Sequence, residues 1–162
     1  MSMPTVHALT ALPITPSRFR PYGQMIAASL DGKPFDGEDA QLQLDQGVPR
    51  FYIMRLQERG RKFSQITRHQ KCTQCLGSLE GKEWLIAVAP PGAVPAPALD
   101  SIVAFRVPGN CFIKLEVGTW HAGPYFEQDS IDFYNLELSD TNLIDHHTCN
   151  LQEIYGVEFE IA

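Results

Sequence analysis

Residues 82–92 read KEWLIAVAPPG, and the apolar run from Trp84 to Val88 within them decides the fold class. A continuous apolar run is typical of a strand that is buried on both faces. Further short segments of strand character recur at intervals of about ten residues, with turn residues between them. These segments are RFYIMRLQ (50–57), FSQITRHQ (63–70), SIVAFRV (101–107), CFIKLEV (111–117), IDFYNLELS (131–139) and VEFEI (157–161). The pattern favours an all-β fold, either a sandwich or a small barrel.

The chain length predicts one domain. A chain of 162 residues is long enough for one domain with a real core, so we expect a single domain over residues 1–162.

The N-terminal part of the chain predicts a helix and a loop. Thr15 is a predicted N-cap and Pro16 a predicted first helical residue, so a short helix should begin there and end at residues 21–23. Residues 29–49 are polar and turn-rich, which predicts a surface loop or hairpin.

The composition is that of an ordinary globular protein with an acidic balance. Hydrophobic residues make up 44%, charged residues 20%, and the formal net charge is −6. A negative balance argues against nucleic acid or an anionic membrane as the partner, since both attract clustered Lys and Arg. No segment approaches the ~18 apolar residues of a membrane span, and residues 1–19 lack the pattern of a secretory signal. We therefore expect a cytoplasmic protein.

Cys72 and Cys75 form a lone CxxC pair. Without a second pair, this spacing is only a weak signal for zinc binding or redox chemistry. Two reduced thiols in a cytoplasmic protein are the more ordinary interpretation.

The histidines are the first candidates for chemistry. His69 and His121 each lie in a predicted strand close to a turn, although a single buried histidine is often only a hydrogen-bonded core residue. His146 and His147 lie in the polar segment DHHTC. Adjacent residues of a strand point to opposite sides, so a solvated loop is the expected setting for this pair.

Lys114 and Glu116 are the second group of candidates, because they share one face of the apolar strand CFIKLEV. That face either meets solvent or lines a polar cavity. Gln74 follows His69 by five positions, so the two side chains converge only if the intervening residues form a bulge or turn.

Three segments resemble the ureidoglycolate lyase family, whose members are small cupins. They are TRHQKCTQCLGSL (67–79), VGTWHAGPYF (117–126) and IDFYNLEL (131–138), and the resemblance extends over most of residues 9–158. It implies a cupin-like double-stranded β-helix with one or two short helices. It also implies an enzyme that splits ureidoglycolate into glyoxylate and urea, as part of purine and allantoin degradation.

Four positions depart from the family pattern. Thr67 stands where a Glu is usual, Gln70 where a Pro is usual, Glu116 where a His is usual, and Ala122 where a second His is frequent. These changes indicate either a different substrate or a branch that has lost the reaction.

The resemblance also assigns roles to particular residues. His69 and His121 would act as acid and base, because imidazole titrates near neutral pH, and Glu116 could replace the missing family His as a base. The remaining assignments concern substrate binding. Lys114 or, less readily, Arg68 would bind the substrate carboxylate, Tyr125 would donate to a carbonyl oxygen, and Gln74 would also contact the substrate.

Two further expectations follow from the resemblance. His69, Gln74, Glu116 and His121 could together hold a divalent ion such as zinc, manganese or nickel. Small cupins commonly pair through edge strands or swapped termini, so we expect a homodimer that binds a small anionic substrate, with the tail VEFEIA (157–162) as the partner strand. The alternatives to the lyase are a metal-dependent cupin with another activity and a cupin that only binds a small molecule.

Overall fold

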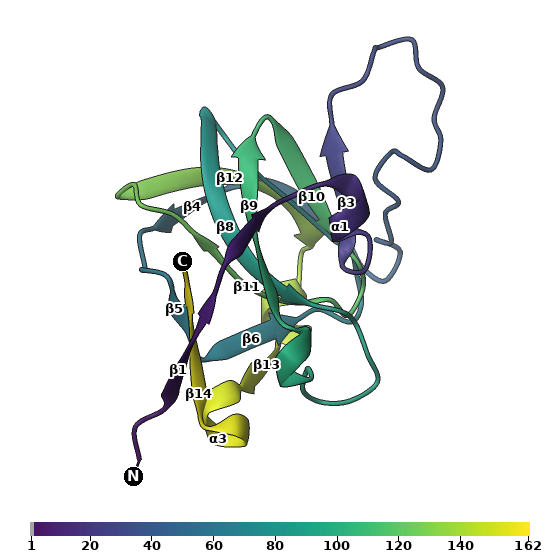
Figure 1. Cartoon of the computed structure of the whole chain (residues 1–162). Helices are drawn as coiled ribbons and strands as arrows, with labels where there is room; N and C mark the ends of the chain where they lie inside the picture. The colour runs from purple at the N-terminus through teal and green to yellow at the C-terminus, as the bar shows by residue number, and fades with distance from the viewer. Residues whose placement is uncertain (1) are drawn as a thin grey trace.

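The computed structural model describes residues 2–162, and short strands dominate it (Figure 1). In chain order the elements are β1 (Thr5–Leu9), β2 (Ala11–Pro13), α1 (Pro16–Phe19), β3 (Gly23–Ala27), β4 (Pro49–Gln57), β5 (Lys62–Phe63), β6 (Gln65–Arg68), β7 (Gln74–Ser78), β8 (Gly81–Ala89), the 3-10 turn η1 (Leu99–Ser101), β9 (Val103–Gly109), β10 (Cys111–Leu115), β11 (Trp120–Tyr125), β12 (Ser130–Leu138), α2 (Thr141–Ile144), β13 (His147–Asn150), α3 (Leu151–Tyr155) and β14 (Val157–Ile161). The predicted all-β fold with short helices is confirmed.

Two larger sheets face each other across a common apolar core. The five-stranded sheet has the order β3-β10-β7-β12-β4, and the six-stranded sheet has the order β13-β6-β11-β8-β9-β2. Most neighbouring strands in both sheets are antiparallel. Leu76, Ile113 and Phe133 of the first sheet belong to the same buried cluster as Trp84 and Phe105 of the second. The arrangement is the cupin-like barrel that the sequence predicts.

The segment that decides the fold class is buried on both faces, as predicted. Residues 84–89 of β8 are all buried. Ile86 lies in the core between the two large sheets, whereas Ala87 lies in a second core that includes Trp120 and Phe159. β8 therefore needs apolar side chains at every position, because apolar layers cover it from both sides.

The C-terminal tail is an internal strand. In a three-stranded sheet of order β1-β14-β5, β14 pairs with β1 in parallel and with β5 in antiparallel orientation. Figure 1 shows β1 and β14 side by side, although they lie at opposite ends of the chain. Within the chain, β14 pairs with β1 over five residues and with β5 over two, so the tail is not a free edge strand, and its pairing with a second subunit stays a prediction.

The N-terminal helix begins as predicted. The Thr15 side chain accepts a hydrogen bond from the Arg18 backbone N–H at 3.1 Å, and Pro16 is the first helical residue. An N-cap oxygen of this kind satisfies one of the donors that the first helical turn leaves free.

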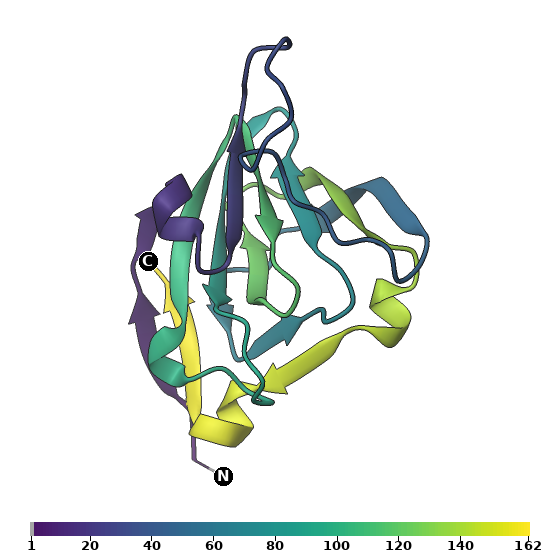
Figure 2. The ribbon, with the colours of Figure 1, turned by 90° about the vertical axis from the view of Figure 1, so that its right-hand side faces the viewer.

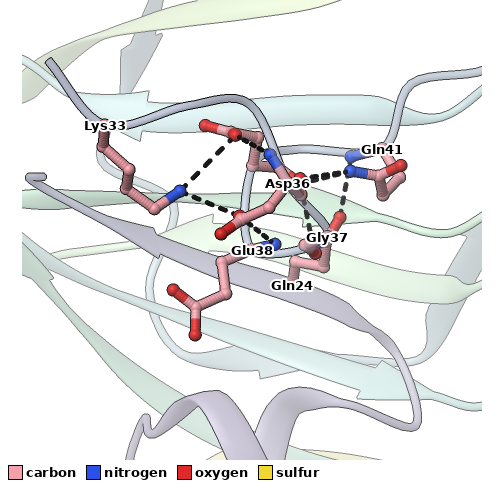
Figure 3. A network of polar contacts seen from close by, with 7 residues as sticks. Gln24, Lys33, Asp36, Gly37, Glu38 and Gln41 are labelled. Carbon is pink, nitrogen blue, oxygen red and sulfur yellow. Dashed lines mark hydrogen bonds and ion pairs between the residues drawn. The ribbon is translucent and has the colours of Figure 1, made fainter. Parts of the chain in front are cut away.

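Residues 28–48 form the predicted surface loop, which projects from the barrel (Figure 2). Figure 3 shows its internal polar contacts: Lys33 Nζ lies 2.8 Å from Asp36 Oδ1 and 3.6 Å from an Asp39 carboxylate oxygen. The loop is tied to the five-stranded sheet by Gln24, whose amide nitrogen donates to the carbonyl oxygens of Gly37 and Asp39. The loop therefore covers part of the outer face of that sheet.

The cysteines support the ordinary interpretation of the CxxC pair. All four are buried and free. Burial raises the pKa of the Cys75 thiol to about 11, which makes it a poor nucleophile at neutral pH. None of the helices in residues 2–162 has the length and apolar character to cross a membrane.

Candidate functional site

Three histidines meet at one side of the barrel. His121 of β11 pairs with Thr67 of β6, and His69 follows the end of β6. The ring centroids of His69 and His121 lie 5.0 Å apart, and those of His69 and His146 lie 5.6 Å apart. Thr67 and His69 share one face of this segment because strand side chains alternate. We call His69, His121 and His146 the histidine cluster.

His69 is held in one orientation by Asp145. Its ring Nδ1 lies 2.7 Å from the Asp145 backbone oxygen, and a carbonyl can only accept, so Nδ1 carries a proton. The Asp145 carboxylate accepts from the backbone N–H groups of Gln70 and Lys71, each at 2.8 Å. One aspartate thus fixes both the ring and the segment that follows it, and in the neutral ring Nε2 is left as a base.

Loss of contact with water keeps His69 and His121 in the neutral form. It lowers the pKa of His69 below the ordinary value, although the nearby Asp145 carbonyl and Glu137 carboxylate act in the opposite direction. The pKa of His121 falls to about 3, first because of burial and second because of the neighbouring His69. At neutral pH each ring is therefore uncharged, with one N–H that can donate a hydrogen bond and one nitrogen that can accept one.

A pocket of about 390 Å³ opens beside the cluster, and we call it the histidine pocket. Its size is within the range of about 300–1,000 Å³ that is common for small-molecule sites. The residues that line it are Arg59, Phe63, Ser64, Gln65, Thr67, His121, Ala122, Gly123, Tyr125 and His146.

Arg59 and Tyr125 add a guanidinium and a phenol to the lining of the histidine pocket. Arg59 Nε donates to the Pro124 carbonyl oxygen at 3.3 Å, and the guanidinium carbon lies 5.6 Å from the centre of the Tyr125 ring. These contacts leave further guanidinium N–H groups for an anion. Burial raises the pKa of Tyr125 to about 12, so its hydroxyl stays protonated and able to donate, as its predicted role requires.

Lys114 and Glu116 are not brought to the histidine cluster, which corrects the expectation that they share its cavity. Ile113 and Leu115 face the core between the sheets, so the alternation of β10 directs Lys114 to the other face. There Lys114 pairs in register with Gln24 and forms an ion pair with Glu116. The two charges share a face, as predicted, but that face lies on the outside of the sheet.

Arg68 also points away from the pocket, as strand alternation predicts. Its guanidinium lies 4.5 Å from the centre of the Trp120 ring, and Nε donates to His147 Nδ1 at 2.9 Å. Arg68 is 5% exposed, so it has a packing role in the second core rather than access to a substrate in the histidine pocket.

The predicted metal ligands do not converge. Glu116 is bound to Lys114 on the outer face, and the Gln74 amide is bound to Asn135 inside the barrel. Throughout residues 2–162, no group of three or more His, Cys, Asp or Glu side chains is placed to hold a metal ion. The set His69, Gln74, Glu116 and His121 therefore does not fit a divalent metal, and we derive no chemistry through one.

Sequence reasoning missed three residues of the site: Arg59, Asp145 and His146. Arg59 lies in a turn between predicted strands, and its pattern gave no signal. The DHHTC segment did carry a signal for the site. Its polar residues precede β13, and β13 pairs with β6 at the end where His69 lies. His146 and His147 separate as adjacent residues should: His146 contacts His69, whereas His147 contacts Trp120.

Comparison with known proteins shows the family of the chain and a likeness to solved structures. The family described as ureidoglycolate lyase matches residues 6–160. A dTDP sugar isomerase from Desulfovibrio desulfuricans G20 is similar in structure, with a TM-score of 0.45 and 12% sequence identity, over 80% of this chain and 85% of that chain. Among curated proteins, none matches the chain.

Proposed function

The chain belongs to the ureidoglycolate lyase family, and from this premise we propose that its histidine pocket cleaves ureidoglycolate, or a closely related 2-hydroxy ureido acid, to glyoxylate and urea. Such a substrate carries a hydroxyl group and a ureido nitrogen on the same carbon. When a base removes the hydroxyl proton, the oxygen forms a carbonyl and the C–N bond breaks. Its electron pair leaves with the nitrogen, which takes up a proton and departs as urea.

The reaction moves one proton from oxygen to nitrogen, so it needs no redox partner. A single imidazole can carry that proton in both steps. His69 suits this role, because Nε2 of its neutral ring can accept the hydroxyl proton and return it to the leaving nitrogen. The hydrogen bond from His69 Nδ1 to the Asp145 backbone oxygen is the observation that carries this assignment, since it fixes the tautomer.

His69 does not line the histidine pocket itself but packs against His121 and His146, which do. The groups that line the pocket position the substrate. Arg59 supplies a guanidinium for the substrate carboxylate, in place of the Lys114 that the sequence favoured. His121 stays neutral and donates or accepts a single hydrogen bond next to His69. Tyr125 offers a hydroxyl to a carbonyl oxygen of the substrate.

Release of glyoxylate from ureidoglycolate by the purified protein tests the proposal. His69→Gln should lower kcat by about 10²–10⁴-fold, the usual contribution of a general base. His7→Gln is the matched control, because His7 packs against Phe159 in the β1–β14 pair and does not line the histidine pocket. Wild-type protein without glyoxylate release, or a His69→Gln variant with unchanged kcat, would refute the lyase assignment.

The same purified protein also tests the main alternative to the lyase. A metal-dependent cupin of another activity requires stoichiometric bound metal, which elemental analysis of the purified protein measures directly. Glyoxylate release that persists after dialysis against a chelator would support the metal-free route.

A further inference from the structure

His146 is the member of the histidine cluster that contacts the buried base and also lines the open pocket. Its ring centre lies 5.6 Å from that of His69, and it belongs to the lining of the histidine pocket. His69 is 6% exposed and is absent from that lining. A proton that moves between His69 and a substrate in the pocket therefore needs a group between them. His121 and His146 both lie in that place.

His121 is poorly suited to carry this proton. Loss of contact with water and the neighbouring His69 lower its pKa to about 3, so at pH 7 the charged ring is about 10⁴ times rarer than the neutral ring. His146 is exposed, and water can solvate its ring while the ring carries a charge. Of the two imidazoles that line the pocket, His146 is therefore the better proton carrier.

Two threonine hydroxyl groups orient the His146 ring. His146 Nδ1 lies 3.4 Å from Thr148 Oγ1, and Thr148 Oγ1 lies 2.9 Å from Thr67 Oγ1. Thr148 of β13 and Thr67 of β6 are register partners, so their side chains share one face of the sheet, and Thr67 lines the pocket. The contact with Thr148 occupies Nδ1 and leaves Nε2 as the nitrogen available for proton transfer.

His69 offers the matching nitrogen. Its Nδ1 donates to the Asp145 backbone oxygen at 2.7 Å, so Nε2 of the neutral ring is again the free atom. Asp145 directly precedes His146 in the chain, so one segment both holds the His69 ring and carries His146 to it. The separation of the two rings is therefore built into the fold. It is short enough for a proton to pass directly or through one hydroxyl group.

We propose that His146 is a second catalytic residue of the histidine pocket and carries the proton between the substrate and His69. This inference rests on the proposed function and names a further residue of its site. As the substrate O–H bond breaks, its proton passes by way of His146 Nε2 to His69 Nε2. The same path returns it to the ureido nitrogen, which leaves with the electron pair of the broken C–N bond.

Chemical rescue tests this role. His146→Ala should lower kcat for glyoxylate release by about 10²–10⁴-fold, and free imidazole in the assay should restore part of the loss, because the vacated position is open to solvent. His69→Ala is the matched comparison. It should lose similar activity without rescue, because His69 is buried. His7→Ala, outside the pocket, should keep the wild-type kcat.

A second variant separates proton transfer from the support of the fold. His146→Gln keeps a polar side chain next to Thr148 but cannot carry a proton, so it should lose as much activity as His146→Ala. Thr148→Val removes the hydroxyl that orients the ring and should lower kcat by about 2–10-fold with little change in KM. Thr148→Ser should restore the wild-type value, which a role in packing alone would not produce.

The outcomes distinguish this inference from the proposed function. Wild-type kcat in His146→Gln, or a loss in His146→Ala that imidazole does not restore, would overturn the carrier role and leave the lyase assignment standing. Wild-type protein that releases no glyoxylate would overturn both.

Discussion

His69 is buried and His121 is half-buried, and both are held in the neutral form, which couples folding to pH at the scale of single residues. Both pKa values are lowered in the folded state, that of His121 to about 3, whereas an unfolded histidine titrates near 6.5. Below about pH 6.5 the unfolded chain therefore binds more protons, and the free energy of unfolding falls as the pH falls. The stabilising contribution is fully present above that pH.

The measurement is a series of urea denaturation curves between pH 7 and pH 4. Each neutral histidine contributes a slope of up to about 1.4 kcal/mol per pH unit within its window. His121→Gln should flatten the pH dependence relative to wild type, and the carboxylates that also titrate cancel in the comparison. Identical slopes in the two proteins would contradict the neutral state of His121.

Arg59 gives a second prediction at this scale. A charge-assisted hydrogen bond contributes about 1.5–3 kcal/mol, so Arg59→Gln should raise KM for ureidoglycolate by about 10–100-fold and change kcat much less. Arg18→Gln is a close control, because the Arg18 guanidinium also donates to a backbone carbonyl, that of Pro13, but lies outside the histidine pocket. Equal KM values for the two variants would refute the proposal that Arg59 binds the substrate carboxylate.

At the scale of elements, the close contact between β8 and β9 depends on a pair of glycines. Gly81 and Gly109 are register partners, and a Cβ atom added to Gly109 would collide with backbone atoms of Gly81. Gly109→Ala should therefore destabilise the fold by about 1–3 kcal/mol. Gly92→Ala is the control, since no heavy atom lies within 4 Å of its added Cβ. Thermal or urea denaturation of the two variants measures the difference. Equal denaturation midpoints would show that the added Cβ of Gly109→Ala is accommodated without cost.

The same scale shows how far the sequence predicts the site. Alternation correctly places Lys114 and Glu116 together, and it correctly separates Arg68 from His69. Alternation does not say which face of a strand meets the other sheet. In β10 the pattern cannot decide which face is the inner one, because residues 113–115 are all buried. Ile113 and Leu115 face the second sheet, whereas Lys114 is buried on the opposite face. Arg59 and Asp145 were beyond prediction because loops bring them in from distant positions.

At the scale of the whole molecule, the repeated short strands predict two facing sheets. The sequence does not predict which strands pair when they lie far apart in the chain. VEFEI looks like an edge strand by composition. It becomes internal only because β1, from the opposite end of the chain, joins it along one side and β5 along the other. Register with a remote segment depends on packing that local sequence does not encode.

We propose that the predicted homodimer pairs through β4, because β14 is already paired within the chain. Strand β4 ends the five-stranded sheet, bonds only to β12, and exposes Phe51 (70%) and Ile53 (63%) on its outer face. A long apolar edge invites pairing, and two copies of one strand pair antiparallel about a two-fold axis. Light scattering should report a dimer that Phe51→Lys with Ile53→Lys converts to a monomer, whereas Leu143→Lys, at another exposed apolar residue, leaves it intact. A wild-type monomer, or a dimer that survives the double substitution, would contradict this interface.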